Sequence, residues 1–353
     1  MTIPAVHTYR VFMVAALLAV MLVSIDGSAA EPEKPQAAWV NVSDGTIRQL
    51  AADGRQIDWP GGTAGVVVDP SNGDVYMIVP GQGVWKSVDR AETFKRCDGG
   101  SVSGRCETAF SLNVDPAGNR LACFMLDGTG AWAGDGGRTW QKFTDVGRNW
   151  DFAAVDWSAA EVETIFAGLH ESGGQVMFSA DGGGTWMKLF HDPEFDKSGS
   201  LGVFDARTLV YSQKGQGIQR STDAGKTWSR VSDLSPIGRV VRMLHGTAYW
   251  LGQEGLFVST DQGATWRVQG SPVKASIGPL LDPQDKDRIV VAGVDGVFRS
   301  SDGGKTWTLI VKLPPGADIP KPGWYSNVAW DPIHDIFYVS KMGEPTYRFQ
   351  AKR

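Results

Sequence analysis

His170 and Glu171 are adjacent residues whose side chains could carry out acid–base chemistry. An imidazole titrates near neutral pH and can serve as a general base or a metal ligand. Adjacent residues point to opposite sides of a strand, however, and a loop histidine can equally be a plain hydrogen-bonding group. Tyr325 is a third candidate, with the alternative that it only begins a strand. These three residues are therefore catalytic candidates and not assignments.

Known chemistry-bearing motifs are missing from the rest of the chain. The sequence has no G-x-S-x-G elbow, P-loop, H-E-x-x-H, dinucleotide fingerprint, C-x-x-C-H or D-x-[DN]-x-[DN]-G calcium loop. We therefore predict no cofactor and no metal site. The formal net charge is −5 and stays −5 without residues 1–30, which contain one Arg and one Asp. This mild acidity argues against a nucleic-acid partner, which would favour a basic patch.

An eight-residue pattern, S-x-D-x-G-x-T-W, recurs along the chain and indicates the fold that must position these candidate residues. It recurs six times with its aspartates at 89, 135, 181, 223, 261 and 302, spaced by 46, 46, 42, 38 and 41 residues. A period of about 40–45 residues is typical of a propeller blade. Each copy lies between two short apolar runs, which is the pattern of a β-hairpin.

The motif residues are expected to be structural. The aspartate can accept hydrogen bonds from its own turn, the glycine suits a backbone with positive φ, and the large apolar ring packs against a neighbouring sheet. Six equivalent copies indicate one such task in every blade. The residues concerned are Asp89, Asp135, Asp181, Asp223, Asp261 and Asp302 with Trp140, Trp186, Trp228, Trp266 and Trp307.

Two further strands precede each motif, so each repeat contains four strands, A to D in chain order, with the motif at the C–D turn. A seventh repeat begins near Asn327 and provides only three strands. The segment 38–42 resembles the strands that follow the motifs and is predicted to complete this last blade, which removes an unpaired sheet edge. We predict an all-β, seven-bladed propeller, with six or eight blades as the alternatives.

The face opposite the motif turns carries the D–A connections and the B–C turns. Loops of this kind commonly carry function. The predicted ligand-binding residues on this face are Arg105, Glu107, Asp127, Arg148, Asp151, His170, Glu171, Glu254, Trp324, Tyr325, Lys341 and Glu344. The same mixture of charged and aromatic residues would also suit an ordinary solvated rim.

Residues 1–30 have the pattern of a secretory signal peptide. Arg10 is followed by the apolar run 11–23 and by small residues that end at Ala30. An uncleaved anchor is the alternative, although the run is shorter than the roughly 20 residues of a membrane span. We expect cleavage near Ala30, a secreted or periplasmic mature propeller of residues 31–353 without a membrane span, and a monomer.

Three cysteines, at 97, 106 and 123, would be exposed to an oxidising compartment after export. Cys97 and Cys106 flank a glycine-rich loop that a disulfide would pin, whereas Cys123 lies in an apolar run. We predict a Cys97–Cys106 disulfide, although sequence alone allows three pairings.

The repeated motif resembles the BNR/Asp-box repeat of sialidases, of the sortilin receptor, of xyloglucan-active glycosidases and of photosystem II assembly-factor propellers. The resemblance covers residues 64–310 by motif. It implies the propeller fold, but this family contains enzymes, receptors and assembly factors, so function depends on the site. Sialidases of this kind would require an Arg-Ile-Pro signature in the first blade, and none lies between residues 38 and 96.

Two functions follow from these observations. The first is a non-catalytic exported propeller that binds a glycan or a protein partner through its loop face. The alternative is a carbohydrate-active enzyme, a sialidase-like glycosidase or a polysaccharide lyase, with its site at the propeller axis. In a glycosidase two carboxylates must meet, about 5 Å apart for retention or about 6.5–9.5 Å apart for inversion. Convergence of Asp127, Glu171, Glu254 and Glu344 in one pocket would favour the enzyme, whereas carboxylates scattered around the rim would count heavily against catalysis.

Overall fold

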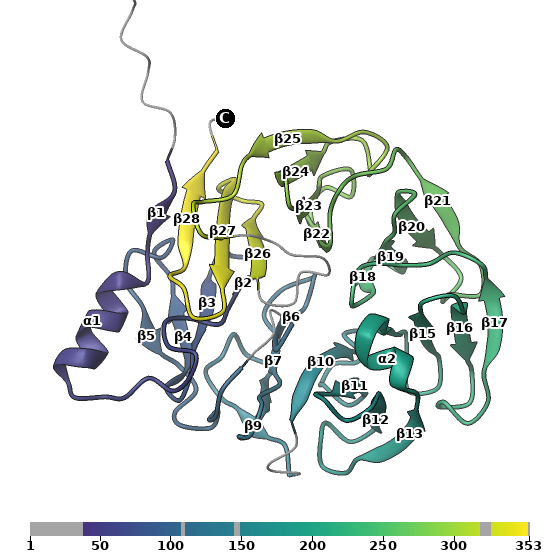
Figure 1. Ribbon diagram of the computed structural model, residues 1–353, viewed down its shortest axis with the longest axis horizontal. Coiled ribbons are helices and arrows are strands. Elements are labelled where there is room, and N and C mark those ends of the chain that lie inside the picture. Colours follow the sequence, from purple (N-terminus) through teal and green to yellow (C-terminus); the bar gives the residue numbers. More distant parts are fainter. Residues whose placement is uncertain (1–37, 107–109, 145–148, 318–325, 352–353) are drawn as a thin grey trace, which may run out of the picture. The chain divides into compact units, whose positions relative to one another are not determined.

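The computed structural model describes residues 38–106, 110–144, 149–317 and 326–351. They form seven four-stranded sheets, which Figure 1 shows as blades around a common centre. Neighbouring strands in every blade are antiparallel, and strand A lies innermost. The predicted all-β, seven-bladed propeller is confirmed.

The first three blades follow one another along the chain. Blade 1 contains β2 (Gly65–Val68), β3 (Val75–Val79), β4 (Gly83–Ser87) and β5 (Lys95–Arg96). Blade 2 contains β6 (Leu112–Val114), β7 (Leu121–Cys123), β8 (Ala131–Ala133) and β9 (Gln141–Lys142). Blade 3 contains β10 (Trp150–Val155), β11 (Ile165–Leu169), β12 (Gln175–Ser179) and β13 (Met187–His191).

The next three blades repeat this order. Blade 4 contains β14 (Ser200–Val203), β15 (Leu209–Gln213), β16 (Gly217–Ser221) and β17 (Ser229–Ser232). Blade 5 contains β18 (Arg242–Leu244), β19 (Thr247–Leu251), β20 (Leu256–Ser259) and β21 (Arg267–Gln269). Blade 6 contains β22 (Ile277–Leu281), β23 (Ile289–Gly293), β24 (Gly296–Ser300) and β25 (Thr308–Val311).

Blade 7 is assembled from both ends of the propeller and confirms the predicted closure. Its inner strands are β26 (Ser326–Asp331), β27 (Ile336–Lys341) and β28 (Tyr347–Gln350), and β1 (Val40–Asn41) forms its outer edge. Val40 pairs with Arg348 and Asn41 with Tyr347. The indole nitrogen of Trp39 also donates to the carbonyl of Lys312 at 2.8 Å, which ties the closing segment to the connection that leaves blade 6.

The motif turns are held by hydrogen bonds to their own aspartate. Asp302 Oδ1 accepts from the backbone N–H of Thr306 at 2.9 Å, and its Oδ2 accepts from the Thr306 hydroxyl at 2.6 Å. The bonds from the motif threonine to both carboxylate oxygens recur at Asp89, Asp135, Asp181, Asp223 and Asp261. The side-chain hydrogen bond from Thr306, followed by its backbone N–H and the Ser300 hydroxyl, lowers the pKa of Asp302 to about 2.

The hydrophobic core is divided among the blade interfaces. One cluster joins blades 1 and 2, another joins blades 3 and 4, and a third joins blades 6 and 7. Trp140 packs against the first of these clusters and Trp228 against the second, while Trp186, Trp266 and Trp307 pack against further clusters of the core. Strands such as β3 are buried throughout because a neighbouring sheet covers each face. The core therefore stabilises the ring and each blade together.

Two short helices lie outside the blade pattern and were not predicted. Helix α1 (Asp44–Ala52) follows the closing strand, and the side-chain oxygen of Asn41 accepts from the backbone N–H of Asp44 at 3.2 Å. Helix α2 (Pro193–Ser198) forms part of the connection from blade 3 to blade 4, with Asp192 as its N-cap. Both helices lie in segments that the repeat pattern predicts to be connections without regular secondary structure.

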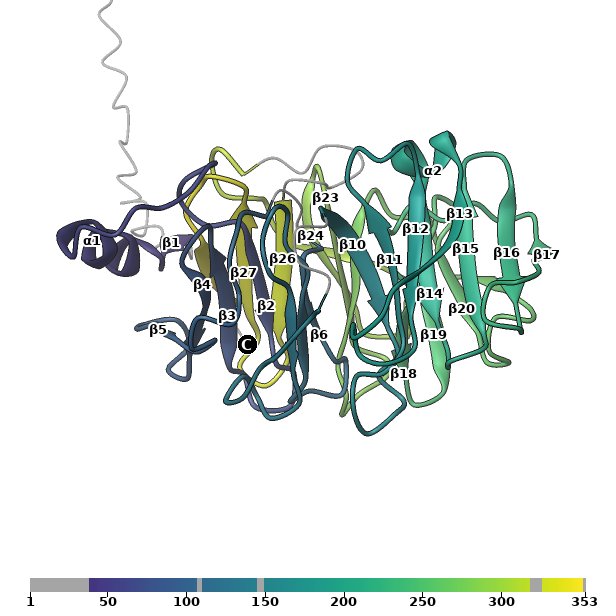
Figure 2. The same ribbon diagram turned by 90° about the horizontal axis from the view of Figure 1, so that it is seen from below.

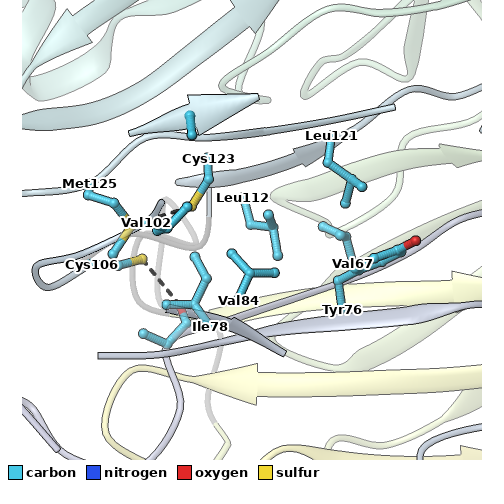
Figure 3. Packing of buried hydrophobic residues seen from close by; sticks show 12 residues of the cluster. Val67, Tyr76, Ile78, Val84, Val102, Cys106, Leu112, Leu121, Cys123 and Met125 are labelled. Carbon is cyan, nitrogen blue, oxygen red and sulfur yellow. Dashed lines mark hydrogen bonds between the residues drawn. The ribbon is translucent and has the colours of Figure 1, made fainter. Parts of the chain in front are cut away.

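The predicted Cys97–Cys106 disulfide is not formed in the structure. The Sγ of Cys97 contacts the carbonyl of Val84 at 3.5 Å, whereas that of Cys106 lies 3.8 Å from the carbonyl of Ala64. Figure 3 shows Cys106 and Cys123 among the buried apolar side chains of blades 1 and 2. Burial raises the pKa of Cys97 to about 12 and that of Cys123 well above its usual value.

A buried ion pair already pins the loop that the disulfide was expected to hold. Asp98 Oδ1 lies 2.7 Å from Nε of Arg96, and Asp98 Oδ2 accepts from the backbone N–H of Val102 at 2.9 Å. Asp98 is almost fully buried. The loop therefore has a structural anchor without a covalent bond.

Candidate functional site

The B–C turns and the D–A connections lie at one end of the blades, and the motif turns lie at the other. Figure 2 shows the blades from the side, with turns at both ends. On the loop face, the backbone N–H of Gly81 in a B–C turn donates to the carbonyl of Gly104 in a D–A connection at 2.9 Å. Contacts of this kind bring side chains from different blades together.

Arg105 and Asp127 form an ion pair on this face, between the connection that leaves blade 1 and the B–C turn of blade 2. Nε of Arg105 lies 2.9 Å from Oδ2 of Asp127, and the backbone N–H of Arg105 donates to Oδ1 at 3.2 Å. The Asp127 side chain is still 51 % exposed. The pair therefore orients a carboxylate that remains open to solvent.

Asn149 links the B–C turns of blades 2 and 3. Its side-chain oxygen accepts from the backbone N–H of Asp127 at 2.9 Å. Its carbonyl accepts from the backbone N–H of His170 at 2.8 Å. One residue of the blade 2 to blade 3 connection thus fixes both turns relative to each other.

His170 is held by a buried carboxylate. Its Nδ1 lies 2.7 Å from Oδ1 of Asp151, whose side chain is only 8 % exposed, and its Nε2 lies 3.8 Å from Oε1 of Glu171. The Glu171 side chain is 85 % exposed. A carboxylate on Nδ1 orients an imidazole and directs Nε2 outward. Sequence adjacency paired His170 with Glu171, whereas its short contact comes from Asp151 on strand β10.

Asp127 and Glu171 share an unusual backbone conformation. Both have φ of 44°, a left-handed value that is uncommon for residues other than glycine. The B–C turns of blades 1, 4 and 7 place Gly81, Gly215 and Gly343 in the left-handed region. Blades 2 and 3 therefore carry a carboxylate side chain in the B–C turn where these three blades use glycine.

On the loop face, Asp127 and Glu171 are the described residues other than glycine that have this left-handed conformation. The other described left-handed residues that are not glycine lie on the motif turns or on the A–B turns at the opposite end of the blades, at Arg90, Ala91, Asn119, Ala224, His245, Gln262 and Asp335. Left-handed residues with side chains cost energy and concentrate at functional sites. Asp127 and Glu171 are therefore the described carboxylates on this face whose backbone geometry points to a function.

Trp59 is a site residue that the sequence reasoning missed. It is 56 % exposed, and its ring centroid lies 5.4 Å from the guanidinium carbon of Arg105. Trp59 precedes blade 1 and so lies outside the repeats from which the site residues were predicted. Its neighbour Asp58 donates its backbone N–H to the carbonyl of Pro80, next to the B–C turn of blade 1, which places this segment on the loop face. An exposed ring beside a polar network suits a sugar ring.

The four carboxylates proposed to converge do not meet in one pocket. Asn149 bonds to Asp127 and to His170, the neighbour of Glu171, but Glu254 and Glu344 are exposed on the B–C turns of blades 5 and 7. Lys341 donates from Nζ to the carbonyl of Gly316 at 3.1 Å. Glu107, Arg148, Trp324 and Tyr325 lie outside the described residues.

A hollow of about 630 Å³ lies between the connections of blades 6 and 7, on the same face. Its lining includes Asp295, Lys312 and Lys341 together with Leu313 and Pro314. Blade 6 adjoins blade 7, and blade 7 adjoins blade 1, so this hollow and the residues from Trp59 to Glu171 on the loop face occupy consecutive blades. Within the described ranges, no group of three or more His, Cys, Asp or Glu residues could hold a metal ion, and no helix is long and apolar enough to cross a membrane.

Comparisons with known proteins confirm the repeat and identify relatives. The BNR/Asp-box repeat family matches residues 219–230, the motif of blade 4. A probable oligoxyloglucan-reducing end-specific xyloglucanase of Neosartorya fischeri is 25 % identical over 297 residues, covering 72 % of this chain and 36 % of its own length. A xyloglucanase of a Paenibacillus species is 27 % identical over 301 residues, covering 72 % of this chain and 27 % of its own length. The chain therefore spans about a third of the length of these relatives.

A solved structure of an ancestral GH74 enzyme is also similar. It is 15 % identical, covers 81 % of this chain and 44 % of its own, and has a TM-score of 0.49. The relatives named as xyloglucanases overturn the first functional prediction, that of a non-catalytic binding propeller. They favour the alternative, a carbohydrate-active enzyme.

Proposed function

We propose that this propeller is a glycoside hydrolase domain that acts on a neutral β-glucan of the xyloglucan class. The observation that carries the proposal is the pair of left-handed carboxylates, Asp127 and Glu171, on adjacent B–C turns that Asn149 links through its bonds to Asp127 and His170. The names of the relatives support the substrate class. Because the chain spans about a third of these relatives, the activity of the whole protein is part of the proposal.

Hydrolysis of a glycosidic bond needs a proton donor for the leaving oxygen and a second carboxylate on the other side of the sugar. Asp127 is oriented by its ion pair with Arg105 and is the proposed base or nucleophile. Glu171 is exposed beside Nε2 of His170 and is the proposed proton donor. Asp151 and Asn149 are positioning residues, because they hold His170 and the two turns.

Trp59 is the proposed stacking platform for a sugar ring next to the carboxylates. Its exposed ring can cover the apolar face of a glucose unit, while Arg105 keeps it in place from the other side. The hollow beside blades 6 and 7 offers room for further units of the same glycan chain. A chain running from this hollow past Trp59 would reach Asp127 and Glu171.

The test is release of reducing ends from xyloglucan, with an unbranched β-glucan and a sialylated glycan as comparison substrates. We expect products from xyloglucan, and a loss of at least about 100-fold in kcat for Asp127→Asn and for Glu171→Gln. Trp59→Ala is expected to raise KM with a smaller change in kcat. Glu254→Gln and Glu344→Gln are matched controls, because they neutralise exposed carboxylates on the same face at blades 5 and 7.

Binding of xyloglucan without product release would contradict the hydrolase and leave a glycan-binding module. Product release that survives both Asp127→Asn and Glu171→Gln would place the chemistry elsewhere on the molecule. The stereochemistry of the first product, followed by NMR, then assigns retention or inversion.

We further propose that the propeller works outside the cytoplasm, as a monomer, after removal of residues 1–30. The support is the signal-peptide pattern that ends at Ala30. N-terminal sequencing of the protein recovered from its native host is expected to begin at residue 31. An intact residue 1 in that material would contradict export.

A further inference from the structure

A small cavity lies at the axis of the propeller, away from the loop-face site. It holds about 60 Å³ and is lined by the innermost strands of five blades: β2, β6, β18, β22 and β26. Figure 1 shows these strands around the centre of the ring. Its lining is apolar at most positions, with Val67, Leu112, Leu280 and Trp330 as examples.

Arg242, the first residue of β18, brings a positive charge into this apolar lining. It is half-buried and is one of the residues that line the cavity. Within the described part of the chain it forms no ion pair and no side-chain hydrogen bond. The cavity lining also contains no acidic residue.

Burial alone lowers the pKa of Arg242 to about 10, and no neighbouring carboxylate acts against this effect. Arginine keeps its proton at neutral pH even so. A buried charge without a partner costs several kcal/mol in general, and this is why buried charges in proteins are normally paired. No residue in the described part of the chain therefore supplies a counter-charge to the Arg242 side chain.

Asn327 adds a second hydrogen-bond donor to the same cavity. Its amide nitrogen donates to the carbonyl of Val66 at 2.6 Å, and its side-chain oxygen accepts from the backbone N–H of Val328 at 3.0 Å. An amide nitrogen carries two hydrogens, so one remains for a ligand. Arg242 and Asn327 thus supply donors, which suit an anion.

We infer that the axial cavity is a binding site for a small monovalent anion, either a halide such as chloride or a small carboxylate such as formate. One water needs about 10–15 Å³ of such space, so the cavity has room for a few waters or one small anion. It is too small for a sugar acid or a nucleotide. The bound anion would form an ion pair with Arg242 and so neutralise the positive charge that this residue of blade 5 brings into the cavity.

The test compares thermal unfolding in sodium chloride, sodium formate and sodium gluconate at one ionic strength. Gluconate is too large for the cavity and serves as the reference anion. We expect chloride or formate to raise the Tm of the wild-type protein by a few degrees over gluconate, and to leave that of Arg242→Met unchanged. Arg207→Met, which removes an exposed arginine from blade 4, is the matched control and should respond as the wild type does.

Crystals of the wild-type protein soaked in bromide provide a second measurement that does not depend on the variant. An anomalous peak next to the Arg242 guanidinium is expected. A larger Tm gain in formate than in chloride would identify a carboxylate as the preferred occupant. The inference is overturned if wild type and Arg242→Met respond alike to the anions, or if bromide gives no peak in the cavity.

Discussion

Asp127 and Glu171 show how single residues carry the proposed function at a cost to the fold. Both adopt a left-handed backbone in turns where blades 1, 4 and 7 use glycine. A left-handed conformation costs a residue with a side chain roughly 1–2 kcal/mol. A purely structural propeller would gain from glycine at both positions, so the retained carboxylates point to the site.

Glu171→Gly is expected to stabilise the protein by about 0.5–1 kcal/mol while it abolishes hydrolysis. The gain is smaller than the relieved strain, because glycine also increases the entropy of the unfolded chain. Urea unfolding measures this difference. Glu254→Gly is the control, since Glu254 is not left-handed and its replacement should give no gain. Equal stability changes in the two variants would contradict strain at Glu171.

The motif turn is the element that makes the fold depend on pH. Hydrogen bonds from the motif threonine depress the pKa of Asp302 to about 2, against an ordinary value of 3.8, and they lower the pKa of Asp181, Asp223 and Asp261 as well. A depressed pKa means that the folded protein favours the ionised carboxylate. Its stabilising effect is complete above about pH 4 and is lost as the pH falls towards 2.

We therefore expect Tm to fall steeply between pH 4 and pH 2. Asp302→Asn should have a lower Tm than the wild type at pH 6, and this gap should narrow as the pH falls through that window. Differential scanning calorimetry at several pH values measures both. A gap that stays constant from pH 6 to pH 2 would show that Asp302 acts through shape and not through its charge.

The closing strand β1 is a second element with a measurable role. It pairs with β28, and the Trp39 ring packs against Phe349 with ring centroids 5.3 Å apart. A chain that begins at Asp44 should have a Tm at least about 5 °C below one that begins at Ala38, because the edge of blade 7 becomes unpaired and several contacts are lost. Trp39→Ala should fall between the two. An unchanged Tm in the shorter chain would refute closure by this strand.

Some elements could be predicted from the sequence and others could not. The motif strands and the closing strand follow from a repeated pattern, since each blade must bury the same faces. Helices α1 and α2 interrupt connections that have no repeat to compare with. The predicted disulfide is likewise not formed in the structure. The sequence shows two cysteines on either side of a loop, but it does not show that the Arg96–Asp98 ion pair holds this loop.

At the scale of the whole molecule, the ring decides which residues meet. His170 contacts Asp151 within blade 3, and Asn149 bonds to both Asp127 and His170 because loops of adjacent blades lie side by side. Linear spacing carries no trace of these contacts, so the sequence could list the residues of the face but not pair them. The same limit applies to Arg242, which faces the axis only once the ring is closed.

The seam in blade 7 also has a mechanical consequence. β1 and β28 are antiparallel, with Val40 opposite Arg348 and Asn41 opposite Tyr347, so the chain enters β1 and leaves β28 at the same end of the ladder. A pull that separates the two ends would load these pairs one after another, as in unzipping, and not all at once. The β1–β28 pair that closes the ring is thus stabilised against heat by packing, but it separates readily under tension applied between the two ends of the chain.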